Sequence, residues 1–303
     1  KGLILDYRTN GGGVLQSAVQ VLSLFVPTGT KVVEMKGRGK DENKSFYTEY
    51  EPLLPDLPLV VLIGENSASA AEIVAGALQD LDRAVVVGGR SFGKGLVQAQ
   101  IPFSDGSAMR LTVARYYTPS GRSIQRPYTN GDDMAYHMDL IDRYNRNEFF
   151  SADSIHFDDS MKFTTPGGRT VYGGGGIMPD ITTPIDTSDY TDYWAELSRR
   201  GVLAEFVVSF LDNHRSELAA QYSTDDKFVD QFVVSDTMIE NLAIFAEQKG
   251  IARRDDELAI SRDAIAEIIK GLIAQRLWDT TAYFKVVNSS NPMLRAALDV
   301  LDN

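Results

Sequence analysis

The chain has 303 residues, 43% of them hydrophobic and 24% charged, so it is long and apolar enough to fold around one large core or two moderate ones. Its 42 acidic residues outnumber the 30 basic ones and give a formal charge of −12, which argues against binding to nucleic acid or anionic lipid. It has no cysteine, which excludes disulfides, a thiolate nucleophile and a cysteine zinc site.

The chain opens on an apolar run in which Leu3, Ile4 and Leu5 predict a buried strand. A natural N-terminus usually has a polar lead-in before its first strand. We therefore expect this chain to be a piece of a longer protein, with any signal peptide upstream. No stretch reaches the roughly 18–20 uninterrupted apolar residues of a membrane-spanning helix.

Up to Thr118, short apolar runs alternate with helical patterns, which is typical of strands connected through helices. The predicted strands are Leu3–Leu5, Leu59–Ile63 and Ala84–Val87, and the predicted helices are Val14–Phe25 and Ser69–Leu81. Two alternating segments around the turn signal Asp105-Gly106 then predict a hairpin, Gly95–Pro102 with Ser107–Tyr117. These elements predict an α/β core.

The rest of the chain changes character twice. A polar stretch at about 127–165 predicts an insertion, and Gly173–Gly176 leads into a turn that ends the core, so we place a first domain at 1–185. From 186 to 303, apolar residues recur every three or four positions, above all in Val202–Leu218, Asp236–Gln248 and Arg262–Leu277. We predict a helical C-terminal region, and favour a packed bundle over a surface for homo-oligomers.

Ser69 stands where a predicted strand gives way to a predicted helix. A serine there commonly caps the helix, because its oxygen accepts a hydrogen bond from an orphan backbone N–H. The same position suits a nucleophile, because a helix N-terminus offers free N–H groups and a positive dipole end to an oxyanion. The junction alone does not decide between the two roles.

Lys94 is framed by Gly93 and Gly95 just after a predicted buried strand. Surface lysines are usually solvated, but glycines let the backbone come close to other elements and direct the amine inward. A lysine base must be neutral, which requires its pKa to fall from about 10.4 to about 7–8 through burial. That shift costs roughly 4 kcal/mol, so a fold would carry it for a functional reason.

The same residues, Gly88 to Lys94, also match part of a phosphate-binding loop, G-x-x-x-x-G-K. The match fails at Gly95, where that motif needs a hydroxyl for Mg²⁺. The next residues, from Leu96, predict a strand and not a helix that opens onto phosphate. Nucleotide binding is therefore disfavoured.

Four blocks of the sequence, in this order, resemble the carboxyl-terminal processing peptidases, serine proteases related to tail-specific protease. The blocks are Leu5–Gly13, Ser67–Asp80, Ser91–Gln98 and Tyr116–Gln125, and the later Gly175–Asp180 fits as well. The resemblance covers roughly the first 185 residues and implies a ClpP/crotonase-like α/β fold. Tyr7 and Gly11 replace a common leucine and a common proline, which a glycine turn tolerates.

The resemblance implies a Ser–Lys dyad mechanism without a metal or organic cofactor. It assigns Ser69 as the nucleophile, Lys94 as the general base and Gln98 as the residue that supports the lysine. The lysine would take the proton of the serine as the serine attacks the scissile carbonyl, and water would then hydrolyse the acyl-enzyme.

The resemblance also implies an oxyanion hole, a substrate class and a location. The oxyanion donors would be the backbone N–H of Ala70 and that of a glycine in the first block, Gly12 or Gly13. Substrates would be proteins cut near their C-termini, often with apolar terminal residues, in the periplasm or cell envelope. The family's peptide-binding PDZ module precedes the first block, and we expect it to be absent from this chain.

Two other interpretations are weighed against the dyad. His137, His156 and His214 lie outside the four blocks, and no carboxylate cluster forms a ligand array with them, so a Ser–His–Asp triad and metal catalysis are disfavoured. The fold also resembles non-enzymatic modules that bind retinoids, other lipids or proteins. In such a module we expect the nucleophile or the base to be replaced, whereas Ser69 and Lys94 are both present.

Overall fold

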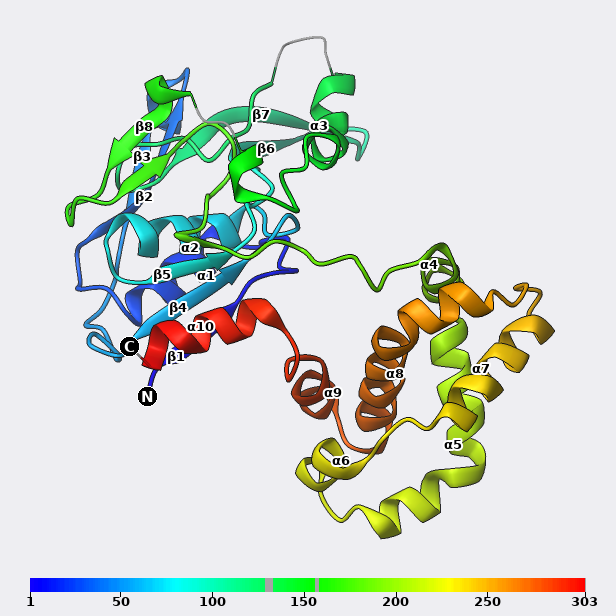
Figure 1. Ribbon diagram of the computed structural model, residues 1–303. Helices are drawn as coiled ribbons and strands as arrows, with labels where there is room; N and C mark the ends of the chain where they lie inside the picture. The colour runs from blue at the N-terminus through cyan, green and yellow to red at the C-terminus, as the bar shows by residue number, and fades with distance from the viewer. Residues whose placement is uncertain (129–132, 156–157, 303) are drawn as a thin grey trace. The chain divides into compact units, whose positions relative to one another are not determined.

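The computed structural model describes residues 1–128, 133–155 and 158–302. The chain forms two compact units (Figure 1). The first consists of Lys1–Ile185 together with Pro292–Asn303, and the second of Asp186–Asn291. The predicted division at 1–185 and 186–303 differs in the last residues, which join the first unit.

The first unit is built on a parallel sheet in the order β1-β4-β5-β10. Its strands are β1 (Leu3–Asp6), β4 (Leu59–Ile63), β5 (Val85–Gly88) and β10 (Ile181–Thr182). Leu5 pairs with Val61, and Val61 with Val86, so the strands run in step. This sheet confirms the three predicted strands and adds β10 after the predicted terminal turn. The sheet also confirms an α/β core.

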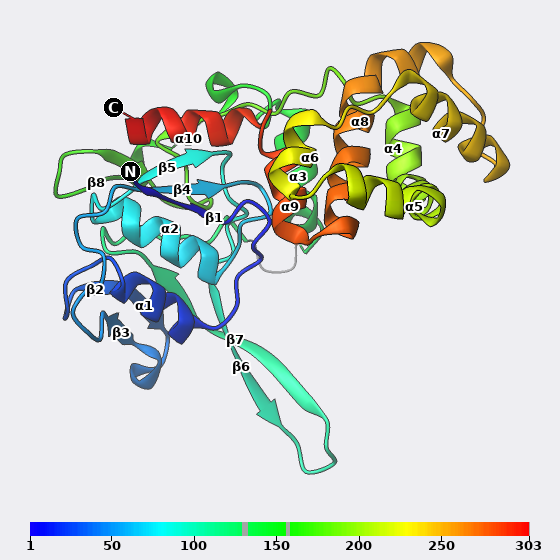
Figure 2. The same cartoon turned by 90° about the horizontal axis from the view of Figure 1, so that it is seen from below.

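Both faces of this sheet are covered, which explains why β4 is apolar throughout. Leu59, Val61 and Ile63 face a core shared with α1 (Leu15–Ser23) and α2 (Ala70–Asp80). Val60 and Leu62 face the opposite side, where α10 (Pro292–Asp302) packs. Figure 2 shows α2 and α10 on opposite sides of β4 and β5. The chain thus returns to its first unit to complete the core.

A second sheet is antiparallel, in the order β3-β2-β7-β6. Its strands are β2 (Lys31–Gly37), β3 (Lys44–Tyr47), β6 (Leu96–Pro102) and β7 (Ala108–Tyr117). The predicted hairpin is confirmed as β6 and β7, which project from the unit (Figure 2). Neither β2 nor β3 is predicted from the sequence, because charged residues interrupt the apolar pattern of β2 and β3 is only four residues long.

The predicted insertion at about 127–165 contains one longer helix, α3 (Asp133–Asn145), and three-residue turns of 3₁₀ helix at Ala152–Ser154 and Asp159–Met161. Residues 129–132 and 156–157, and with them His156, lie outside the described residues. A similar 3₁₀ turn forms at Lys40–Glu42, and a small ribbon, β8 (Lys162–Thr164) with β9 (Thr170–Tyr172), follows the insertion.

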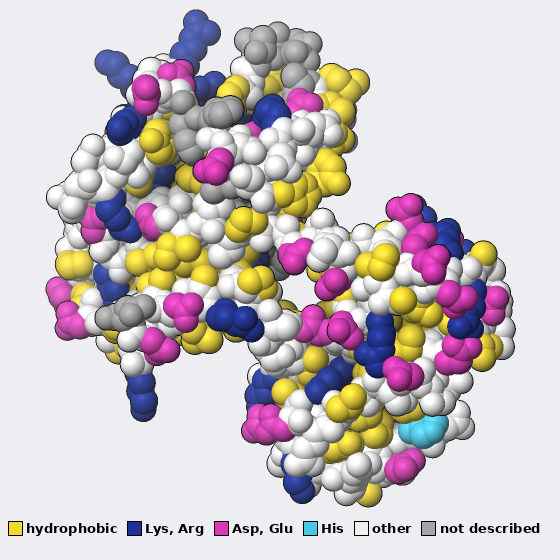
Figure 3. All heavy atoms as spheres, in the orientation of Figure 1, with side chains coloured by type: hydrophobic (Ala, Val, Ile, Leu, Met, Phe, Trp, Pro, Cys, Tyr) yellow, Lys and Arg dark blue, Asp and Glu magenta, His cyan; other side chains and the backbone are white. Residues whose placement is uncertain are grey.

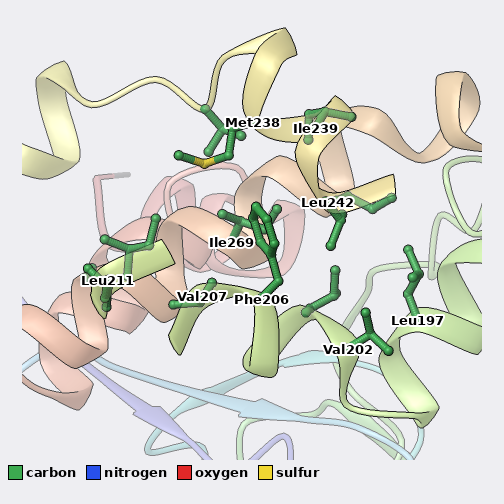
Figure 4. Close-up of a cluster of buried hydrophobic side chains, with 14 of the residues drawn as sticks. Leu197, Val202, Phe206, Val207, Leu211, Met238, Ile239, Leu242 and Ile269 are labelled. Carbon is green, nitrogen blue, oxygen red and sulfur yellow. The ribbon is translucent and has the colours of Figure 1, made fainter. Parts of the chain in front are cut away.

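The second unit is helical, as the periodicity predicts. Its helices are α4 (Asp192–Arg199), α5 (Val202–Gln221), α6 (Asp225–Gln231), α7 (Asp236–Gln248), α8 (Asp255–Leu277) and α9 (Thr280–Val287). Phe206 and Val207 of α5, Leu242 of α7 and Ile269 of α8 gather in one core (Figure 4). The amphipathic faces therefore pack against one another within the unit.

On the face drawn in Figure 3, basic side chains are scattered among acidic ones, so the visible described residues form no continuous basic surface for nucleic acid. Among the described residues, no helix combines the length and the apolar character that crossing a membrane requires.

Candidate active site

Ser69 sits in a strained turn between β4 and α2. It is one of few non-glycine residues with a positive φ, at φ 57° and ψ −118°, outside the regions that L-residues favour. It occupies the N-cap position of α2, but its hydroxyl makes no capping hydrogen bond. The capping role that the sequence left open is therefore not realised, and the half-buried Oγ is available for another partner.

The glycine turn of the first block lies directly against Ser69. The amide of Ala68 donates to the carbonyl of Asn10 over 3.0 Å, which fastens the two loops. A Cβ on Gly12, whose φ is +98°, would lie 2.6 Å from the carbonyl oxygen of Ala68 and 2.7 Å from Cβ of Ser69. Only glycine fits this approach.

The predicted oxyanion donors differ in their hydrogen bonds. The amide of Gly12 donates to Oδ1 of Asn10 over 2.8 Å. The amides of Gly13 and Ala70 have no acceptor among the residues that the structure describes. Ala70 opens α2, so its N–H is one of the helix's orphan donors and lies at the positive end of the dipole. Gly13 and Ala70 are thus the two available donors.

Glu72, on the first turn of α2, connects the serine turn to the lysine loop. Its carboxylate is fully buried, and one oxygen, Oε2, accepts from the amides of both Ser69 and Lys94, each over 2.8 Å. The other oxygen, Oε1, accepts from the Ser91 hydroxyl and from the amide of Gly93 over 2.7 Å. One side chain therefore fixes the backbones of the predicted nucleophile and the predicted base relative to each other.

Burial raises the pKa of the Glu72 carboxyl above its usual value, against the hydrogen bonds from Ser91, Lys94, Gly93 and Ser69, which lower it. Sequence reasoning assigned no role to Glu72. The signal was present, because serine followed three positions later by glutamate is the capping-box pattern.

The side chains of Lys94 and Gln98 are exposed, which differs from the burial expected for a lysine base. The physical reason is that the loop turns its amides, and not this side chain, toward Glu72. In the described part of the chain, Ser69 Oγ, Lys94 Nζ and the Gln98 side chain are not hydrogen-bonded to one another; the bonds of Ser69 and Lys94 to Glu72 come from their backbone amides. Gln98 lies on β6, next to a bulge, opposite Thr112.

The residues after Lys94 form strand β6 and not a helix, which agrees with the argument against a phosphate-binding loop. Of the three histidines, His214 stacks on Phe210 in α5 of the second unit. No group of carboxylates and histidines that could hold a metal ion occurs among the described residues.

A pocket of about 200 Å³ opens beside Ser69. All three predicted oxyanion residues, Gly12, Gly13 and Ala70, contribute to its wall. The rest of the wall is mostly apolar and comes from the first block, α1 and α2: Tyr7, Val14, Ala18, Val21, Ala71 and Val74. Burial raises the pKa of the Tyr7 phenol. The pocket suits a small or medium apolar side chain.

At its other end, α2 is anchored by a buried ion pair. Asp80 lies 2.7 Å from a guanidinium nitrogen of Arg122, and both side chains are almost fully buried. Gln79 accepts from the same guanidinium over 2.7 Å, and the amide of Ser120 donates to Asp80 over 3.0 Å. The fourth sequence block is thereby fastened to the helix that begins at Ser69.

Comparison with known proteins shows which family part of this chain resembles. The model of peptidase family S41 matches residues 1–133, which include the serine turn, Glu72 and the lysine loop. We call these residues, which make up 133 of the chain's 303, the S41 segment. A second match, to residues 193–279 of the helical unit, is to a family of unknown function named DUF8443.

The S41 segment is similar to proteases that are named for processing C-termini. It is 49% identical over 125 residues to a carboxy-terminal-processing protease of Bartonella bacilliformis, covering 41% of this chain and 29% of the relative. It is 43% identical over 125 residues to the carboxyl-terminal-processing protease of a Synechocystis strain, with the same coverage. The chain therefore spans less than a third of the length of these curated relatives.

A solved photosystem II D1 C-terminal processing protease is 40% identical, with a TM-score of 0.38, over 41% of this chain and 32% of that one. The family match and the curated relatives make the S41 segment similar to known serine peptidases. The roles of Ser69, Lys94, Gln98, Gly12, Gly13 and Ala70 remain predictions.

Proposed function

We propose that this protein is a serine endopeptidase in which Ser69 is the nucleophile and Lys94 the general base. The observation that carries the proposal is the bridge through Glu72. One buried carboxylate oxygen accepts from the amides of both residues, and Ser69 Oγ is left uncapped in a strained turn. Strain and unused hydrogen-bonding capacity of this kind concentrate at functional sites.

In the proposed reaction, neutral Lys94 takes the proton from Ser69 Oγ while Oγ bonds to the scissile carbonyl carbon. The amides of Ala70 and Gly13, which have no other acceptor, donate to the oxyanion. The C–N bond then breaks, and the leaving amine takes the proton from Lys94. Water attacks the resulting ester, gives a proton to Lys94 and releases the acid, and Ser69 regains its proton.

This scheme requires the exposed Lys94 amine to swing toward Ser69 Oγ when substrate is bound. A substrate chain that lies over the loop excludes water from the amine, which favours its neutral form. Gln98 follows on β6, and we propose that its side-chain oxygen then accepts from the lysine nitrogen and holds it. A Cβ on Gly95 would lie 2.6 Å from the Gln125 amide nitrogen. The glycine therefore lets the start of β6 pack closely against Gln125.

We propose that the apolar pocket beside Ser69 receives the substrate residue before the scissile bond. Its wall of Val14, Ala18, Val21 and Val74 favours alanine, valine or leucine and disfavours charged side chains, since burial of an unpaired charge is costly. The names of the relatives support cleavage near the C-termini of proteins, and the resemblance of the sequence blocks supports action in the cell envelope.

The test is cleavage of an unfolded reporter protein by the whole protein, with the reporter ending in an apolar or in a charged segment. We expect cleavage of the apolar reporter, and a loss of about 10³-fold or more in Ser69→Ala and Lys94→Ala. Ser45→Ala, at an exposed position on β3, serves as the matched serine control. Wild-type rates in either dyad variant would reject the proposal.

A further inference from the structure

The loop that carries Lys94 is held from two sides, and only one side belongs to the S41 segment. On that side Glu72 accepts from the amides of Gly93 and Lys94. On the other side the loop meets α3, the helix within the insertion, of which residues 134–145 lie beyond the S41 match (Figure 1). No residue of α3 takes part in the proposed reaction.

Arg143 of α3 makes the closest of these contacts. Its side chain is fully buried, where an arginine is rarely found unless its donors are satisfied. Nη1 donates to the Ser91 carbonyl over 2.8 Å, and Nη2 lies 3.4 Å from the carbonyls of Phe92 and Gly175. Burial lowers the pKa of Arg143 to about 10, which leaves it charged at neutral pH.

Arg126 holds the same loop by its guanidinium group and its backbone amide. Its guanidinium lies 4.1 Å from the centre of the Phe92 ring and 4.1 Å from that of the Tyr136 ring, between the loop and α3. Its backbone amide donates to the Gly93 carbonyl over 3.0 Å. Asp139 of α3 lies 3.0 Å from both Arg126 and Arg143 and joins the two cations.

Glu72, a buried anion, thus accepts from the amides of Gly93 and Lys94, and the buried cation of Arg143 contacts the carbonyls that precede them in the loop. Together they fix the peptide planes on either side of Gly93, whose φ of +88° makes it the loop's most adaptable residue. An error of about 1 Å in a catalytic group costs on the order of 10²-fold in rate, so this second attachment matters for a base.

We infer that α3 is a positioning element for the peptidase site, and that Arg143 is the residue through which it holds the loop of the general base. The inference rests on the proposed function for its catalytic consequence, but the attachment of the loop is a separate physical claim. Arg143 touches backbone carbonyls and not the substrate, so it acts through the position of Lys94.

The test compares Arg143→Lys with Arg146→Lys in the whole protein. Lysine keeps the charge at 143, but a single ammonium cannot reach three carbonyls and Asp139 at once. Arg146 follows α3 closely, is half exposed and pairs with Glu148, so its replacement controls for charge and chain position. The readouts are hydrogen exchange of the amides of Gly93 and Lys94, and kcat and KM for the apolar reporter.

We expect Arg143→Lys to exchange these amides at least about tenfold faster and to lower kcat by about 10- to 100-fold with KM within twofold, whereas Arg146→Lys leaves both unchanged. Unchanged exchange and kcat in a folded Arg143→Lys protein would overturn the inference, as would a loss expressed only in KM. If Arg143→Lys does not fold, Asp139→Asn, at a partly exposed position, must show the same pattern more weakly.

The two proposals fail in different ways. A wild-type protein that cleaves nothing would refute the proposed function, and the exchange rates of Gly93 and Lys94 would still show whether α3 holds the loop. If the wild-type protein cleaves and Arg143→Lys has normal exchange and kcat, the proposed function is supported and the positioning role of α3 is refuted.

Discussion

Replacing Glu72 with glutamine changes one oxygen of the bridge into a donor while keeping its size. Four donors converge on the carboxylate, two on each oxygen. The amide can turn its NH₂ group toward Ser91, whose hydroxyl reorients to accept. The Gly93 amide, which shared that oxygen, is then buried without an acceptor.

An orphaned buried donor costs about 1–3 kcal/mol. Burial outweighs the hydrogen bonds in setting the Glu72 pKa, so we count no net gain from the charge itself. We therefore expect Glu72→Gln to destabilise the first unit by about 1–3 kcal/mol at pH 7. Because the folded-state pKa is raised, the stability that protonated Glu72 contributes is complete below the ordinary pKa of 4.5 and is lost as the pH rises through the raised value.

The difference in free energy of unfolding between wild type and Glu72→Gln should accordingly widen as the pH falls toward 4.5. Both tryptophans, Trp194 and Trp278, lie in the second unit, so their fluorescence does not report on this change. Hydrogen exchange of peptides from β4 and α2, measured against urea concentration, follows the first unit directly. Glu51→Gln, at an exposed position, is the matched control. A variant within about 0.5 kcal/mol of wild type, or a difference that widens with rising pH, would refute the reasoning.

Three further substitutions test other contacts. Gly12→Ala should slow acylation of Ser69 at least about tenfold, because the new Cβ would lie 2.6 Å from the Ala68 carbonyl oxygen. The control Gly106→Ala, at a similar φ of +87° but in open space, should not slow it. Equal acylation rates in the two variants would contradict this prediction. Ala297→Asp should detach α10 and lower the free energy of unfolding of the first unit by about 3 kcal/mol or more, because it buries a charge. Leu298→Asp, on the exposed side of α10, should change that free energy little. Proteolysis between the units and hydrogen exchange in β4 measure the effect. Arg122→Met should lower the free energy of unfolding by about 3–5 kcal/mol, because it leaves Asp80 buried and unpaired. Adding Asp80→Leu should restore part of that loss. Additive losses in the double variant would contradict a stabilising ion pair.

The strongly periodic elements could be predicted from the sequence, because each has a local cause. Leu59–Ile63 is apolar throughout since α2 and α10 cover opposite faces of β4. Asp105 and Gly106 form the hairpin turn, with the Gly106 amide bonded to the Phe103 carbonyl. The place of α10 could not be predicted, because its apolar residues recur as in the helices before it and nothing local distinguishes the sheet as its partner.

The site shows the same division. Ser69 and Lys94 could be proposed from the sequence, because Ser69 stands at a strand-to-helix junction, Lys94 lies between two glycines, and both fall in blocks that resemble one family. The spacing of Ser69 and Glu72 is that of a capping box, which is also a local signal. The role of Arg143 could not be read, because it comes from a polar stretch without periodicity and depends on carbonyls some 50 residues earlier in the chain. The exposure of Lys94 likewise follows from the path of its loop and not from its neighbours in sequence.

The most direct measurement of the central claim is covalent labelling of the whole protein with a fluorophosphonate, followed by peptide mapping by mass spectrometry. The account predicts one phosphonylated residue, Ser69, with labelling abolished in Ser69→Ala and slowed at least about 10²-fold in Lys94→Ala. A label on another serine, or an unchanged rate at Ser69 in Lys94→Ala, would contradict the assignment of nucleophile and base.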